Sequence, residues 1–125
     1  MKKISFAIFL FFIITINYSQ KKKCLDFKTG KFEYTNPEFS EWKVMRTDST
    51  QTEINSKNGI ELNATIIWES DCKCVLTYEK ITNSDFKNLI GKKVFVEIIE
   101  IQDLKFKYHS KLDTLEITSE MIKVE

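Results

Sequence analysis

Apolar and polar residues alternate over several short segments of the chain, which is the pattern of β-strands that bury one face. The clearest segment covers residues 60–68. Its apolar face carries Ile60, Leu62, Ala64, Ile66 and Trp68. The opposite face is mostly polar, so this segment is expected to be a half-buried strand.

Two hairpins are predicted around this strand. Residues 51–55 form a shorter strand before it, and the Asn58-Gly59 pair between them is typical of a type I′ turn. After residue 69, a tight connection over residues 70–73 leads into a further strand at 74–81. The middle of the chain is therefore expected to be an antiparallel meander.

The remaining segments extend the meander in both directions. Strands are expected near 31–35, 41–47, 94–101 and 104–109, and a last one carries Leu115 and Ile117. The apolar step Ile98-Ile99 suggests a β-bulge or burial on both faces. The side chains of Asn83 to Asp85 can cap the N-terminus of a helix, and Gly91 can adopt the left-handed conformation that ends one. One short helix is therefore predicted at 84–90.

Seven or eight strands at intervals of roughly ten residues, with almost no helix, indicate an all-β fold. We expect a small antiparallel up-and-down barrel or half-barrel, lipocalin-like in outline, because closure removes exposed strand edges. A β-sandwich is the alternative that the same pattern allows.

The N-terminus has the organisation of a secretory signal peptide. Lys2 and Lys3 precede an unbroken apolar run over residues 6–14, which is shorter than the roughly twenty residues of a membrane anchor. We therefore expect residues 1–19 to be a cleaved signal and residues 20–125 to be one domain. The protein would then be periplasmic or secreted, with no stable membrane span after cleavage.

Charge and motifs exclude several classes of function. The chain has 19 Lys and Arg against 18 Asp and Glu, and loss of Lys2 and Lys3 with the signal leaves 17 against 18. A net charge this close to zero does not favour binding to nucleic acid. There is no glycine-rich phosphate loop and no G-x-S-x-G turn, so we expect a non-enzyme without a cofactor. A hydrolase that uses two carboxylates is the less favoured rival.

The three cysteines are Cys24, Cys72 and Cys74. In an exported protein they favour a disulfide with one thiol left over. A zinc site that adds His109 is the alternative, but a C-x-C pair lacks the usual two-residue ligand spacing. We therefore expect no metal.

Aromatic residues are expected on the inner faces of the strands, and Phe95 is assigned there as well. The candidates for ligand binding are Trp42, Trp68, Tyr78, Phe106 and Tyr108. They either fill the core or line a cup for one small apolar ligand. The filled core is preferred, because so short a chain has little apolar surface to spare.

Three runs of sequence resemble a group of small, uncharacterised secreted bacterial proteins that are often mislabelled as DNA topoisomerase IV. The runs are residues 24–32, 68–72 and 87–92. The resemblance implies the β topology and a disulfide between Cys24 and Cys72, with Cys74 free. It brings no function, and the label does not fit a chain without an ATP-binding loop or a basic surface.

The sequence thus predicts an exported, non-enzymatic β-barrel that acts as a binding or envelope-associated accessory protein. Its partner is either an unknown protein or a small apolar ligand. The alternative hypothesis is a carrier that holds a small apolar ligand in a cup of the barrel.

Overall fold

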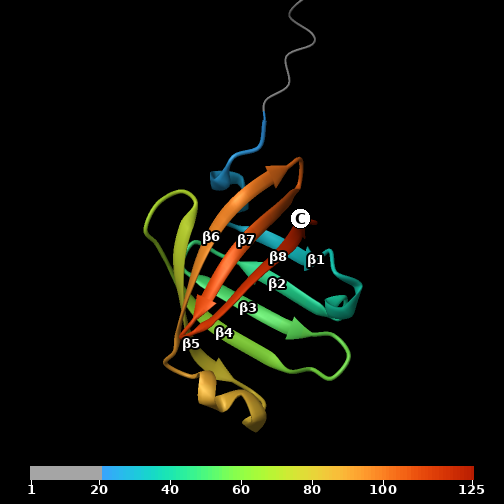
Figure 1. The fold of residues 1–125 in the computed structure, drawn as a ribbon. Helices are drawn as coiled ribbons and strands as arrows, with labels where there is room; N and C mark the ends of the chain where they lie inside the picture. The colour runs from blue at the N-terminus through green and yellow to red at the C-terminus, as the bar shows by residue number, and fades with distance from the viewer. Residues whose placement is uncertain (1–20) are drawn as a thin grey trace, which may run out of the picture.

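The strands of the domain pair in chain order, and the last returns to pair with the first (Figure 1). The computed structural model describes residues 21–125. Its eight strands are β1 (Gly30–Tyr34), β2 (Trp42–Arg46), β3 (Thr50–Asn55), β4 (Glu61–Trp68), β5 (Lys73–Ile81), β6 (Lys93–Gln102), β7 (Lys105–Leu112) and β8 (Leu115–Lys123). The predicted signal peptide lies outside the described residues. Within them, no helix is long and apolar enough to cross a membrane.

Pairing of β1 with β8 closes the sheet. The two strands run antiparallel, with Phe32 opposite Lys123 and Tyr34 opposite Met121. Every other pair of neighbours is antiparallel as well. The prediction of an up-and-down barrel is confirmed in its closed form, so the half-barrel and the β-sandwich do not apply.

The β3–β4 hairpin forms as predicted, but its turn differs. Gly59 has a positive φ of 77°, whereas Asn58 is not among the described residues with positive φ. A type I′ turn needs positive φ at both central residues, so that prediction was wrong. The Asn55 side chain organises a longer loop instead, because its Oδ1 accepts hydrogen bonds from the backbone N–H of Lys57 and Asn58.

The second half of the chain confirms the predicted bulge and corrects two details. The β6–β7 register shifts between Ile98 and Glu100, which places the bulge at Ile99. The helix predicted at 84–90 is a short 3₁₀ helix, η3 (Ser84–Leu89), capped by the Asn83 side chain. Phe95 was assigned to the inner face but is 51% exposed, because Val94 and Val96 on either side of it point inward.

One end of the barrel is closed by a plug of apolar side chains. The 3₁₀ helix η1 (Cys24–Phe27) lies at this end, where Figure 1 shows it beside the tip of the β6–β7 hairpin. Phe27 is fully buried against Phe106, with ring centroids 4.8 Å apart, and Phe106 also contacts Phe32 edge to face at 5.6 Å. Ring contacts of this kind stabilise a core beyond their buried area. We call these three residues the aromatic plug.

A disulfide fastens η1 to the barrel. Cys24 in η1 is bonded to Cys72 in the β4–β5 loop, across 48 residues of sequence. Cys74 is free and buried. The pairing that the resemblance implied is therefore confirmed. The bond therefore holds η1, and with it Phe27 of the aromatic plug, at the closed end.

Loss of this disulfide is expected to cost about 4 kcal/mol of unfolding free energy, because an open chain regains the entropy of a loop of this length. The variant carries Cys24→Ala and Cys72→Ala, and urea denaturation measures the change. Cys74→Ala, which keeps the bond, is the control for loss of a cysteine. A double variant as stable as the control would show that the bond does not stabilise the fold.

Candidate functional site

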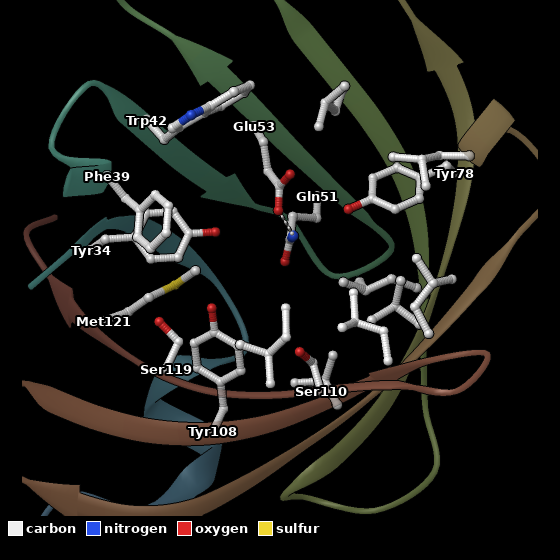
Figure 2. A pocket seen from close by; sticks show the side chains of 18 of the residues that line it. Tyr34, Phe39, Trp42, Gln51, Glu53, Tyr78, Tyr108, Ser110, Ser119 and Met121 are labelled. Atoms are coloured by element: carbon white, nitrogen blue, oxygen red, sulfur yellow. Dashed lines mark hydrogen bonds between the residues drawn. The ribbon is translucent and has the colours of Figure 1, made fainter. Parts of the chain in front are cut away.

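The half of the barrel away from the aromatic plug encloses a cavity of about 310 Å³ (Figure 2). This volume lies at the lower end of the range for small-molecule sites, roughly 300–1,000 Å³. The expectation of a filled core was therefore wrong. Aromatic side chains fill one end only, and those near the other end stand around the empty space.

The cavity wall is mostly apolar and comes from every strand. Its apolar residues are Tyr34, Phe39, Trp42, Leu62, Leu76, Tyr78, Phe86, Leu89, Val94, Val96, Tyr108, Leu112, Leu115, Ile117 and Met121. Two of them, Phe39 of the 3₁₀ helix η2 (Pro37–Phe39) and Leu115 at the start of β8, are 43% and 57% exposed. Because both line the cavity and also reach solvent, the cavity opens at this end, which we call the mouth.

The structure separates the five predicted binding residues into two groups. Trp42, Tyr78 and Tyr108 line the cavity. Phe106 belongs to the aromatic plug, and Trp68 lies near the closed end, where Arg46 and Lys28 stand over its ring at 5.9 Å and 5.0 Å. Alternation predicted the face of these two residues correctly but not their depth along the barrel.

A buried arginine forms the deepest polar group of the cavity. Arg46 ends β2 and is only 5% exposed. Its Nη1 donates to the carbonyl of Phe27 at 3.2 Å, and its guanidinium stands 5.3 Å from the ring of Phe32. Among the described residues no carboxylate forms an ion pair with it within 4 Å. The carbonyl and the two ring faces stabilise the charge in place of a direct counter-ion.

Gln51 and Glu53 of β3 connect this arginine to the cavity. Arg46 Nε donates to Gln51 Oε1 at 2.7 Å, and Gln51 Nε2 donates to Glu53 Oε1 at 3.0 Å. Figure 2 shows the Glu53 carboxyl group projecting into the middle of the space. The three side chains form a hydrogen-bonded chain from the closed end to the cavity, and both of its hydrogen bonds run in the direction of Glu53.

Three tyrosines surround the same carboxyl group. Tyr34, Tyr78 and Tyr108 point their hydroxyl groups into the cavity from three different strands (Figure 2). Burial raises the pKa of all three phenols, and the negative charge of Glu53 raises each of them further. At neutral pH they are therefore neutral groups that both donate and accept hydrogen bonds.

Opposing effects act on the two charged groups. Burial raises the pKa of Glu53 above its ordinary value of 4.5, while Arg46, Gln51 and the Tyr78 hydroxyl stabilise the carboxylate and oppose this shift. Burial lowers the pKa of Arg46, but a guanidinium stays charged in proteins. The interior therefore always holds one positive charge, and Glu53 is the group that can titrate.

Sequence reasoning missed Arg46, Gln51 and Glu53, although the register held the signal. In the β3–β4 hairpin, Glu53 lies opposite Leu62 and Gln51 opposite Ala64. Residues directly opposite each other point to the same face of a sheet. Since Leu62 and Ala64 were assigned inward, their polar partners had to point inward as well.

The remaining chemical candidates do not come together. Within residues 21–125 no three His, Cys, Asp or Glu side chains gather as a metal site would need. His109 lies near Thr118, its Nδ1 3.4 Å from the hydroxyl oxygen. Burial raises the pKa of the Cys74 thiol, which makes it a poor nucleophile.

Comparison of the chain with protein-family models, with curated proteins and with solved structures finds no match.

Replacing Gln51 with Leu is expected to lower the unfolding free energy by about 3 kcal/mol or more. The change leaves Arg46 Nε without its acceptor and removes one of the donors to Glu53 inside the barrel, and unpaired buried groups of this kind are costly. Urea denaturation measures the loss. Thr52→Val, which breaks an outward hydrogen bond of the same strand to Asn63, is the control and should cost less. Equal losses of unfolding free energy in the two variants would show that the buried hydrogen bonds of Gln51 stabilise the fold no more than the outward bond of Thr52.

Replacing Glu53 with Gln is expected to stabilise the protein at neutral pH. The native state holds the Glu53 proton more tightly than the unfolded chain, so Glu53 makes stability fall as pH rises from about 4.5 through its raised native pKa. Unfolding by urea across this range should show a flatter profile for the variant. Glu33→Gln removes the same charge from the outer face, where it pairs with Lys43, and serves as the control. Parallel profiles for wild type and Glu53→Gln would contradict the shift.

Proposed function

We propose that this protein is an exported binding protein that holds one small amphipathic molecule inside its barrel. The observation that carries the proposal is the cavity of about 310 Å³, with an apolar wall toward the mouth and a polar inner end. The sequence allowed two hypotheses, an accessory protein that acts through its surface and a carrier with a cup. Only the carrier requires an open cavity inside the barrel. An open cavity supports the carrier.

The distribution of polarity indicates how the ligand lies. Leu112, Leu115 and Ile117 of the β7–β8 hairpin and the side chains of η3 offer an apolar surface near the mouth. The hydrophobic effect favours an apolar chain there. The Arg46, Gln51 and Glu53 chain and the tyrosine hydroxyl groups lie deeper, where they would satisfy one polar head group.

Export rests on two features of the chain. The N-terminal pattern is that of a secretory signal. A disulfide between Cys24 and Cys72 is typical of proteins that fold in an oxidising compartment. We propose a periplasmic or secreted protein whose ligand reaches it outside the cytoplasm.

Neutral octanol is the probe for this proposal, because it carries an apolar chain and one small polar group. Tryptophan fluorescence should change saturably with octanol, because Trp42 lines the cavity. The change should persist in Trp68→Phe and disappear in Trp42→Phe, while calorimetry still detects binding to both variants.

Two leucines at opposite ends of the barrel provide matched variants. Leu115 lies at the mouth, and Leu104 lies in the β6–β7 turn beside the aromatic plug, 43% exposed. Leu115→Asp should weaken octanol binding about tenfold or more, because it places a charge where the apolar chain lies. Leu104→Asp should leave binding unchanged. Absence of saturable binding, or equal effects of the two variants, would overturn the proposed function.

A further inference from the structure

The ligand would meet one charged group before any other, the carboxyl group of Glu53. Among the described residues that line the cavity, Glu53 is the one acidic side chain and Arg46 the one basic side chain. Glu53 is half-buried and touches the empty space, whereas Arg46 is 5% exposed. A ligand in the cavity would therefore contact the Glu53 carboxyl group, whereas the Arg46 guanidinium lies deeper in the barrel.

The directions of the surrounding hydrogen bonds make the Glu53 carboxylate an acceptor. Gln51 stands between the two charges, accepting from Arg46 Nε and donating to Glu53 Oε1. The Tyr78 hydroxyl also favours the carboxylate form of Glu53. Gln51 thus donates to the carboxylate from the side of Arg46 and Tyr78 stabilises it from β5, while Glu53 also borders the cavity, where a ligand can donate to it.

Phenol hydroxyl groups surround the same point. In Figure 2 the hydroxyl groups of Tyr34, Tyr78 and Tyr108 point into the space around the Glu53 carboxyl group, and Trp42 also borders this space. A neutral phenol oxygen accepts hydrogen bonds, which an ammonium group can donate, and the indole ring of Trp42 can attract a cation. Two features of the cavity, the carboxylate and the phenol oxygens, therefore favour the same type of head group.

We propose that the ligand is a primary alkylamine, whose ammonium group donates to Glu53 between the tyrosines while its apolar chain extends toward the mouth. This inference rests on the proposed function, because it names the head group of the molecule that the barrel holds.

Charge balance separates this ligand from its closest rivals. A carboxylate ligand would bring a second negative charge beside Glu53, and two such groups cannot both ionise at close range. An alcohol donates one neutral hydrogen bond. An ammonium group donates up to three and forms charge-assisted bonds, which are about twice as strong as neutral ones. With the amine bound, the Glu53 carboxylate lies between two positive charges, and Gln51 separates it from Arg46.

The proposal has a definite pH dependence. The groups that face Glu53 are Arg46 of β2, Tyr34 of β1, Tyr78 of β5 and Tyr108 of β7, and at neutral pH the phenols stay neutral and Arg46 stays charged. An alkylamine stays protonated as well, with a pKa near 10, like lysine. Only Glu53 changes charge near neutral pH, so amine affinity should fall as pH falls through the raised pKa of Glu53.

The test compares octylamine, octanol and octanoate by calorimetry on the disulfide-bonded protein at about pH 7. The three molecules share one apolar chain and differ in the head group. Octylamine should bind about tenfold or more tighter than octanol, and octanoate should bind more weakly than octanol. Glu53→Gln should remove the preference for the amine over octanol and the pH dependence of amine binding, because an amide oxygen accepts a hydrogen bond from either head group but carries no charge. A cooperative urea unfolding transition checks that the variant is folded.

Glu33→Gln is the control, because it changes the net charge equally from the outer face of β1. It should leave the preference for octylamine intact. If octanol binds and octylamine binds no tighter, the inference fails and the proposed function stands. Octanoate binding that exceeds both and strengthens at low pH would overturn the inference in favour of an anionic ligand. If none of the three binds, the proposed function fails and the inference with it.

Discussion

A single buried guanidinium sets the polarity of the barrel interior. Arg46 cannot lose its charge, so the surrounding residues must stabilise it. The carbonyl of Phe27, two aromatic ring faces and the amide of Gln51 do so. Gln51 then needs an acceptor for its own N–H, which Glu53 supplies. The inner face of β3 is polar for this reason, in a barrel whose other inner faces are mainly apolar.

A polar strand face cannot be covered by a dry apolar core without a large cost. The polar chain lies next to the cavity, and the apolar side chains pack densely only at the closed end. There the aromatic plug fills the barrel, and the Cys24–Cys72 bond holds η1 over it. The two ends of the barrel thus differ in how their interiors are packed. One end carries the packing that keeps the strands together, and the other keeps space open around the polar groups.

The strands could be predicted because the barrel buries one face of each strand and alternation shows which residues lie there. The segment around Leu62 and the bulge at Ile99 follow directly from apolar spacing. The short helices η1 and η2 could not be found in this way, since neither has an amphipathic repeat. The β3–β4 turn also escaped, because the Asn55 side chain, rather than backbone propensity at Asn58-Gly59, decides its shape.

The candidate site was only partly predictable. Trp42, Tyr78 and Tyr108 were assigned inward by alternation and do line the cavity, but alternation cannot tell a filled core from an open one. That distinction depends on how deep each ring lies along the barrel axis, which is a property of the closed structure. Glu53 was overlooked because a polar residue on a short strand is usually assigned to solvent, and only the register across the hairpin contradicts that assignment.

The open interior also affects stability. A small domain has little free energy to spare, and a cavity forfeits the packing contacts that a filled core would provide. The raised pKa of Glu53 shows a further unfavourable term, since burial disfavours its charge. The disulfide offsets these terms by restricting the unfolded chain. A ligand that fills the cavity and supplies hydrogen-bond donors to Glu53 would remove both unfavourable terms at once. Because such a ligand binds only the folded barrel, its affinity adds directly to the stability of the fold.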